Sequence, residues 1–206
     1  EIKQEEYWQL PDDNEKINEK ELVEELGGVL ENSVLSHARA DVPIGSFLSG
    51  GYDSSAIAYL LKKNNYKPKT FSIGFSNWQK SEDYFAKLVA DHLGLENKKT
   101  IADENSLNYI EKMPEVYDEP IADISIIPTY MVSQLARKYV KAVMSGEGAD
   151  EAFGGYHWQK EFYAKHHPKG FLPQLKSLFN KPDTLSFYAN AMSMGNFDSE
   201  ELKAML

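Results

Sequence analysis

The sequence predicts an α/β fold in which a mainly parallel sheet is covered by helices on both faces. Short apolar runs alternate along the chain with longer segments in which apolar residues recur at helical spacing. Strands that alternate with helices form parallel sheets, because each connection has to cross a face of the sheet. Two of the apolar runs end in glycine-rich turns, which places both turns at the carboxyl ends of strands, and the first of these turns leads into a helix.

The first half of the chain is predicted to contain three helices and two strands. They are a helix over residues 19–40, a strand over 42–48, a helix from the first glycine turn to 64–65, a strand over 69–75 and a helix over 81–93. The strands are short and rich in apolar or β-branched residues, whereas the helices are longer and amphipathic. Gly94 ends the last of these helices, since glycine adopts the left-handed backbone of a helix C-terminus without strain.

The second half is predicted to continue the alternation and then to lose it. Its elements are a strand over residues 98–101, a helix over 106–117, a helix over 127–138, a strand over 140–144 and a terminal helix over 199–206. Pro168, Pro173 and Pro182 interrupt the helical pattern in between. We therefore divide the chain into a linker over 1–18, a core domain over 19–156 and a helical extension over 157–206.

Composition excludes several classes of function. The net charge is −10, but residues 1–31 contain eleven acids against three lysines, so the acidity is local and fits a solvated linker and first helix. Nucleic-acid binding by phosphate neutralisation is not expected. No apolar run is long enough to cross a membrane, and the chain has no cysteine, which suits a reducing cytoplasm. The first residues match neither a secretory signal nor an initiator methionine, so we expect an internal piece of a longer protein.

The first glycine turn is predicted to bind phosphate. Ser49, Gly50 and Gly51 follow the strand and Ala56, Ile57, Leu60 and Leu61 mark the helix after it. Glycines let backbone N–H groups converge, and the first turn of a helix adds unpaired donors and the positive end of its dipole. The alternative is a plain glycine turn with an Asp or Ser cap, but the flanking strand and helix favour the anion site.

The chemistry at this turn differs from that of a kinase-like nucleotide loop. No lysine follows the glycines until Lys62, whereas such a loop places a lysine beside the terminal phosphates. Asp53 lies instead where the loop meets the helix. An acid next to bound phosphates is reasonable only with a Mg²⁺ ion between them, so the sequence predicts a magnesium-dependent site.

A second glycine-rich turn follows the strand at 140–144 and contains the acids Glu147, Asp150 and Glu151. Three like charges in five residues repel one another, so at least one of them should interact with a cation, a proton or a basic partner. A solvated acidic turn is the alternative, but the four interleaved glycines and two aromatic residues do not favour it. Because ligands bind at the carboxyl ends of parallel strands, we expect both turns to face one crevice.

These two motifs resemble known families. The stretch from Ser49 to Ser54 is similar to the pyrophosphate loop of the N-type ATP pyrophosphatases, which cleave ATP between its α and β phosphates to adenylate a substrate. The stretch Gly146–Tyr156 resembles the longer signature of the synthetase domain of glutamine-hydrolysing asparagine synthetases. Weaker similarities surround Thr70–Phe75, Asp118–Glu119–Pro120 and Tyr7–Pro11, where the last is similar to the linker that follows the family's glutaminase domain.

The resemblance implies a fold, cofactors and partners. The fold is the adenine nucleotide alpha hydrolase-like (PP-loop ATPase) type, and the core at 19–156 would be the ATP-binding synthetase domain, with ATP and Mg²⁺ as its cofactors. Aspartate would be adenylated on its side-chain carboxylate with release of pyrophosphate, and ammonia from a glutaminase domain would then displace AMP to give asparagine. The partners are these small molecules, with neither nucleic acid nor membrane, and the full-length protein is compatible with a homodimer in the cytoplasm.

The resemblance also implies roles for individual residues. Glu147 matches the family's catalytic acid, and Asp53 and Asp150 match its magnesium ligands. The residues that match ATP- or pyrophosphate-contacting positions are Leu48, Ser49, Gly50, Gly51, Asp53, Ser54, Ser55, Ile73, Ser145 and Gly146. Glu151 is expected to support its neighbours without touching substrate.

The chain departs from the family pattern in ways that keep other functions open. Tyr52 stands where leucine is usual, and the glutaminase domain and a downstream phosphate-contacting lysine are missing, so the isolated chain is expected to be inactive. A related adenylating enzyme, of the β-lactam synthetase or polysaccharide-cluster kind, would share both turns and take another carboxylate. A non-catalytic nucleotide-binding module is the remaining alternative, and the intact acids Asp53, Glu147 and Asp150 argue against it.

Overall fold

The computed structural model describes residues 3–9, 18–76, 78, 81–119, 121, 123 and 125–166. The chain forms two compact units, Glu1–Ser145 and Gly146–Leu206. The first unit contains the sheet and the glycine turn after its first strand, whereas the second contains the acidic turn. We describe each unit by itself. The terminal helix predicted at 199–206 lies outside the described residues.

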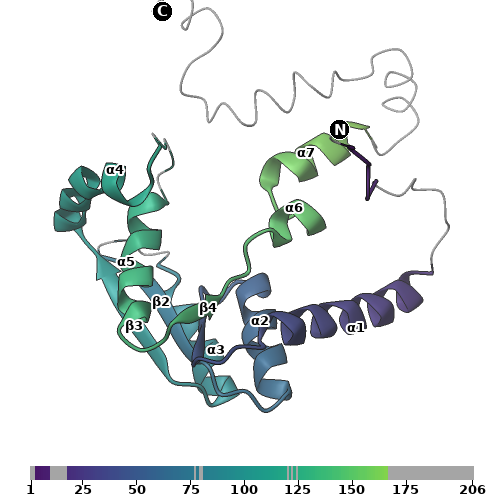
Figure 1. The fold of residues 1–206 in the computed structure, drawn as a ribbon, viewed down its shortest axis with the longest axis horizontal. Coiled ribbons are helices and arrows are strands. Elements are labelled where there is room, and N and C mark those ends of the chain that lie inside the picture. The colour runs from purple at the N-terminus through teal and green to yellow at the C-terminus, as the bar shows by residue number, and fades with distance from the viewer. Residues whose placement is uncertain are drawn as a thin grey trace, which may run out of the picture. The chain divides into compact units, whose positions relative to one another are not determined.

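Figure 1 shows the elements in chain order. They are α1 (Glu19–His37), β1 (Ile44–Phe47), α2 (Tyr52–Lys63), β2 (Lys69–Phe75), α3 (Asp83–Leu93), β3 (Asn97–Ala102), the 3-10 helix η1 (Glu104–Lys112), α4 (Met113–Val116), α5 (Ile126–Arg137), β4 (Ala142–Met144), α6 (Ala149–Phe153) and α7 (His157–His166). The last two belong to the second unit. None of the helices in the described part of the chain is long and apolar enough to cross a membrane.

The four strands form one sheet in the order β3-β2-β1-β4, and every neighbouring pair is parallel. The chain runs outward from β1 through β2 to β3 and then returns to the other side of β1 as β4. This reversal puts the carboxyl ends of β1 and β4 side by side, with Ser46 paired to Met144. Such a switch point is where open parallel sheets bind their ligands.

Helices cover both faces of the sheet, as the sequence predicted. On one face α5 packs against β2, and buried Phe71 contacts Val132 and Ala136 of that helix. On the other face Leu48, Ala58 of α2 and Ala86 and Ala90 of α3 form a second cluster. Helix α1 extends this second face, where its Val34 packs with Leu61. The predicted fold class is thereby confirmed.

Small polar residues line the sheet beneath α3. Ser46 and Thr70 are fully buried, and Asn97 donates from its amide nitrogen to Ser72 Oγ at 3.1 Å and accepts from Thr70 Oγ1 at 3.0 Å. These bonds, together with the bond that Ser46 Oγ donates to the carbonyl of Phe47 at 3.2 Å, satisfy the hydroxyl groups inside the core, where an unpaired one is costly. Small side chains on the sheet, together with the alanines of α3, let the helix approach the strands closely.

Several predicted elements differ in detail from the structure. The first strand is Ile44–Phe47 instead of 42–48, and α3 begins at Asp83 instead of 81. The helix expected at 106–117 is a 3-10 helix followed by the single turn α4, because Pro114 lacks the N–H that an α-helix would need there. The first helix ends at His37 instead of 40. The last strand starts at Ala142 instead of 140, because the N–H of Val140 bonds to the carbonyl of Ala136 and closes α5.

Candidate functional site

The glycine turn continues directly from the end of β1. Leu48, which is buried, donates its backbone N–H to the carbonyl of Phe71 at 2.9 Å and so extends the pairing with β2 by one residue. The chain then turns through Gly50, whose φ of +88° is in the left-handed region that favours glycine. Gly51 is the N-cap of α2. The predicted order of strand, glycine turn and helix is therefore confirmed.

Gly50 also lies directly against the backbone of α3. A Cβ atom at this position would be 2.6 Å from both the carbonyl carbon of Phe85 and the nitrogen of Ala86. Backbone atoms cannot move aside as the end of a flexible side chain can. Two independent constraints, the positive φ and the close approach, thus require glycine at this position.

Two serines hold the turn in shape. The hydroxyls of Ser49 and Ser54 are 3.0 Å apart, and Ser54 Oγ also accepts a bond from the N–H of Ser49 at 3.2 Å. Ser49 Oγ in turn accepts from the N–H of Gly51 at 3.2 Å. The turn is therefore braced by its own side chains, so that its backbone is preorganised.

The N-terminus of α2 has the chemistry of a phosphate site. No side chain caps this twelve-residue helix, and its first N–H groups have no partner within the helix. Ser55 lies in the same first turn of α2. Among the described residues, its Oγ is the one buried side-chain polar atom that has no hydrogen-bond partner. Uncapped donors, a positive helix end and an orphaned hydroxyl fit a bound phosphate group.

Asp53 lies in the first turn of α2, where the helix dipole favours its negative charge. The described residues contain no group of three or more histidines and acids that would hold a metal ion by themselves. Mg²⁺ usually binds one or two protein carboxylates and completes its shell with water and substrate phosphates. Asp53 beside a phosphate cradle suits that kind of shared coordination.

Ile73 lies on β2 beyond the end of β1. Its side chain packs in the cluster beneath α5, so the residue reaches a ligand only through its backbone. The carbonyl of Phe71 points toward β1, because it accepts the bond from Leu48. The last paired residue of β1, Phe47, lies opposite Phe71, so Ile73 lies beyond the end of that strand. Backbone groups of alternate residues in a strand point to the same side, so the N–H and C=O of Ile73 point in the same direction as the carbonyl of Phe71. This places them on the side of β2 where the glycine turn begins.

The acidic turn of the second unit is built differently. Gly148 has a φ of +89° and precedes α6, which is only five residues long, and Gly154 ends this helix with a φ of +69°. A Cβ at Gly155 would overlap Oδ1 of Asp150, so the Asp150 carboxylate lies directly over that glycine. Glycines thus surround the short helix that carries the acids.

Tyr156 binds one of the three acids. Its hydroxyl donates to Oε1 of Glu151 at 2.5 Å. This bond raises the pKa of Tyr156 to about 12 and lowers the pKa of Glu151 below its usual value. The partner of Glu151 is therefore a tyrosine hydroxyl. The sequence had predicted a cation, a proton or a basic group as the partner of at least one of the three acids.

The structure brings some of the predicted site residues together and describes others separately. Leu48 to Ser55 and the backbone of Ile73 lie at one end of the sheet in the first unit. Ser145 directly follows β4 in the same unit and is half-buried. Gly146, Glu147 and Asp150 belong to the second unit. Their participation in the same site as Asp53 stays a prediction.

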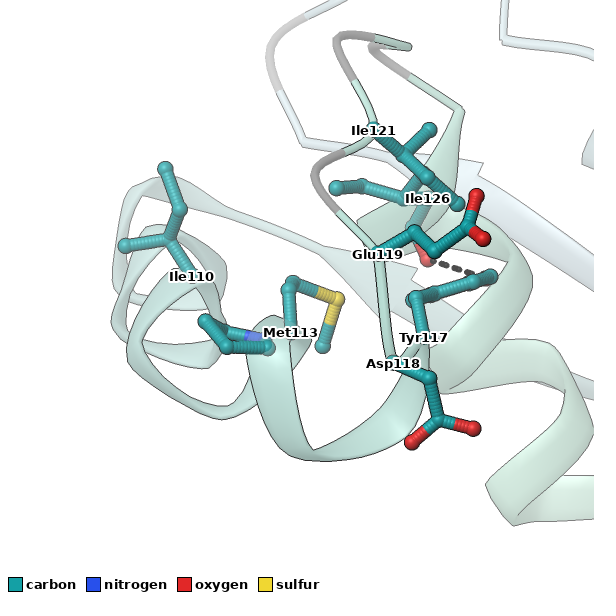
Figure 2. A pocket seen from close by; sticks show the side chains of 8 residues that line it. Ile110, Met113, Tyr117, Asp118, Glu119, Ile121 and Ile126 are labelled. Atoms are coloured by element: carbon teal, nitrogen blue, oxygen red, sulfur yellow. Dashed lines mark hydrogen bonds between the residues drawn. The ribbon is translucent and has the colours of Figure 1, made fainter.

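One pocket was not predicted from the sequence. It has a volume of about 530 Å³ and is lined mainly by apolar residues, including Ile110, Met113, Tyr117 and Ile126. Figure 2 shows Met113 facing Ile121 and Ile126 across the hollow, with the hydroxyl of Tyr117 bonded to the carbonyl of Ile126. The pattern Asp118–Glu119–Pro120 marked this segment, but the apolar residues around it are spaced for an ordinary helix and gave no signal of a pocket.

Comparison with known proteins identifies relatives of this chain. The family model described as asparagine synthase matches residues 25–203. An asparagine synthetase [glutamine-hydrolyzing] 1 of Bacillus subtilis is 46% identical over 147 residues, which are 71% of this chain and 23% of that protein. A putative asparagine synthetase [glutamine-hydrolyzing] 2 of Methanocaldococcus jannaschii is 41% identical over 159 residues, 76% of this chain and 31% of that protein. The matched part of the chain therefore spans less than a third of the length of each of these relatives.

Among the solved structures that the comparison matched is the NMN synthetase from Francisella tularensis. It is 18% identical, with a TM-score of 0.44, over 68% of this chain and 59% of that one. The glutamine-dependent NAD+ synthetase from Acinetobacter baumannii, solved in complex with ADP, has a TM-score of 0.43 at 11% identity and covers 94% of this chain and 44% of that chain.

Proposed function

Because the chain belongs to the asparagine synthase family, we propose that it is the ATP-binding part of an amide-forming ligase of the glutamine-hydrolysing asparagine synthetase type. The membership confirms the resemblance that the two glycine turns indicated. The observation that carries the proposal is the N-terminus of α2, which has no side-chain cap, follows Gly50 and Gly51 and lies beside the orphaned hydroxyl of Ser55. This is a preformed cradle for the pyrophosphate part of ATP.

The proposed reaction has two steps. An oxygen of the aspartate side-chain carboxylate attacks the α phosphorus of ATP, the bond to the bridging oxygen breaks, and pyrophosphate leaves with that bond's electrons. Ammonia then attacks the acyl carbon of the aspartyl adenylate, loses a proton, and AMP leaves as the amide forms. The first step joins two anions, so donors that are already oriented contribute most to the rate. The first turn of α2, which no side chain caps, supplies such donors, and the serine-braced turn before it holds them in place.

Mg²⁺ would neutralise phosphate charge at this site. Asp53 has the position for it, at the first turn of the helix that carries the phosphate cradle. Asp150 is the second proposed ligand, on the family resemblance of its turn. With both in place, the repulsion between Asp53 and bound phosphates becomes an attraction through the shared ion.

The remaining roles follow from the resemblance. Glu147 is proposed to accept the proton of the attacking ammonia. The adenosine part is proposed to contact Ser145, Gly146, Leu48 and Ile73. The direction of the Ile73 backbone supports the contact proposed for that residue. A glutaminase domain as the ammonia source, a homodimer of the full-length protein and a cytoplasmic location are likewise proposals.

Calorimetric titration of this chain tests the proposal. The ligands are ATP and an analogue that is not cleaved between the α and β phosphates, each with and without Mg²⁺. We expect magnesium-dependent binding that Asp53→Ala abolishes and that Asp91→Ala leaves intact. Asp91 is the matched control because it is an exposed acid on α3 whose carboxylate binds only Lys87 among the described contacts. Binding without magnesium dependence, or equal loss in both variants, would contradict the proposed role of Asp53.

A negative result with the wild-type chain has two explanations that a further titration separates. The chain spans only part of its relatives, so a longer chain with flanking segments is titrated in the same way. Binding by the longer chain supports the site and shows that flanking segments complete it. No binding by either chain, with both folded, contradicts the proposed function.

A further inference from the structure

A chain of polar contacts fixes the first turn of α3 to two strands. The N–H of Phe75, the last residue of β2, donates to Ser81 Oγ at 3.0 Å, and Ser81 Oγ donates to Oδ1 of Asp83 at 2.5 Å. The ammonium group of Lys99 on β3 donates to Oδ2 of the same carboxylate at 2.8 Å. Both oxygens of Asp83 are thus used, and they join α3 to β2 and to β3.

Asp83 is packed as well as bonded. A Cβ atom at Gly74 of β2 would be 2.7 Å from Cγ of Asp83, so the carboxylate rests on the strand itself. Its side chain is 17% exposed, compared with 59% for Asp91 on the same helix. Lys99 and Ser81 hold the pKa of Asp83 below its usual value, which keeps the carboxylate ionised at neutral pH. A partly buried ion pair of this kind is screened by salt less than a surface pair.

The same turn of α3 is the surface on which the glycine turn rests. Gly50 approaches the backbone at Phe85 and Ala86, two and three residues after Asp83, with no space for a Cβ between them. Ala86 is fully buried and packs in one cluster with Leu48, which precedes the turn. A shift of this part of α3 would therefore displace Gly50, and with it the N–H groups of the turn.

We propose that Asp83 is a positioning residue for the phosphate-binding turn, because it fixes the part of α3 against which Gly50 is packed. Asp83 itself touches no ligand in this mechanism; it acts through the backbone of α3. The ligand part of this inference rests on the proposed function, whereas the mechanical part concerns the turn alone. Neither the sequence motifs nor the resemblance pointed to Asp83.

The substitution that tests the mechanism is Asp83→Asn, which keeps the volume and removes the charge. Hydrogen exchange of the Ser49 and Gly51 amides, which donate to Ser54 Oγ and Ser49 Oγ, is followed by NMR. Loss of a charge-assisted bond should accelerate their exchange about tenfold, which corresponds to ~1.4 kcal/mol. Lys99→Met should have the same effect, since it removes the other half of the pair. Asp91→Asn is the matched control, because it breaks the exposed Lys87–Asp91 pair of the same helix and should change nothing at the turn.

The pattern of exchange separates positioning from general stability. Acceleration confined to the turn and the start of α3 supports the inference. Uniform acceleration throughout the sheet, or no difference between Asp83→Asn and Asp91→Asn, overturns it.

A second measurement connects the turn to its ligand. Magnesium pyrophosphate is titrated into each variant, and Asp83→Asn should weaken binding about tenfold through the same displacement, while Asp91→Asn binds like the wild type. Unchanged affinity in Asp83→Asn overturns the inference. If the wild type itself fails to bind pyrophosphate in this chain and in a longer one, the proposed function fails, but the exchange experiment still decides whether Asp83 positions the turn.

Discussion

The turn after β1 and the turn after β4 have the same order of strand, glycine turn and helix, but they present different chemical groups. Each follows a parallel strand, contains at least one glycine with positive φ and leads into a helix. The first is braced by serine hydroxyls and opens onto a twelve-residue helix without a side-chain cap, so it presents backbone N–H groups. The second surrounds a five-residue helix and presents carboxylates, one of which is bound by Tyr156.

This difference indicates a division of tasks. Backbone donors and a helix dipole attract anions, and acidic side chains attract metal ions or protonated amines. The first turn should therefore be sensitive to changes that move its backbone, and the second to changes that move its side chains. Four substitutions, with three further variants as their controls, test that contrast from the largest expected effect to the smallest.

Gly50→Ala should have the largest effect. A non-glycine residue at its positive φ costs ~1–2 kcal/mol, and overlap with the backbone of α3 adds ~1–3 kcal/mol, so the free energy of unfolding should fall by about 3 kcal/mol. Gly148→Ala has a similar φ but nothing within 4 Å of its Cβ, so only the first cost applies. Urea unfolding measures both. Equal losses in the two variants would remove the contrast between a crowded and an open turn.

A control for these glycine substitutions is present in α1. Gly28 lies in the middle of that helix, and a Cβ there meets nothing within 4 Å. Gly28→Ala should therefore stabilise the chain by ~0.5–1 kcal/mol. A loss of stability would mean that α1 is more closely packed than the structure shows.

Gly155→Ala should move the Asp150 carboxylate and leave most of the fold intact. The new methyl group would occupy the place of Oδ1, which is the mobile end of a side chain, so the unfolding free energy should change by only about 1 kcal/mol. The magnesium dependence of ATP binding should nevertheless be lost. Retained magnesium dependence would show that the position of this carboxylate is not important to the metal.

Ser55→Ala separates stability from binding in the first turn. The hydroxyl of Ser55 is buried without a partner, so its removal should leave the unfolding free energy unchanged or raise it by up to ~1 kcal/mol. Pyrophosphate binding should weaken about tenfold if the hydroxyl bonds to the phosphates. Ser54→Ala is the counterpart, because it removes bonds to Ser49 and should cost ~1 kcal/mol of stability. Equal destabilisation by both variants would contradict the assignment.

Tyr156→Phe should have the smallest effect on stability. Its main effect should be on the titration of residue 156 and of Glu151. The wild type should contain a tyrosine with a pKa of about 12, visible in the ultraviolet absorbance, and the variant should lack it. Because the folded pKa is above the usual 10.0, the contribution of this bond to stability is complete below pH 10.0 and is lost as the pH rises through about 12. The pKa of Glu151 should return toward its usual value in the variant. An unchanged titration of Glu151 would show that the Tyr156 bond does not hold in solution.

The sequence by itself determined the local elements and the chemistry of both turns. Glycine at 50 and at 94, the amphipathic pattern of α3 and the apolar run of β1 are short-range signals, because backbone φ and hydrophobic periodicity act within a few residues. They were sufficient for the order of strand, turn and helix. Pro114 is a signal of the same short range, and it breaks the helix that the apolar spacing of 106–117 predicts.

The tertiary structure decided what depends on residues far apart in the chain. The placement of β4 beside β1, the crowding of Gly50 by Phe85 and Ala86, and the attachment of Asp83 to Lys99 join segments that no periodic pattern connects. Such contacts form only when the sheet has been assembled and α3 has packed on it, since each helix buries its face against strands from different parts of the sequence. The sequence thus specified the glycine turn after β1, and packing on α3 set the position in which that turn is held.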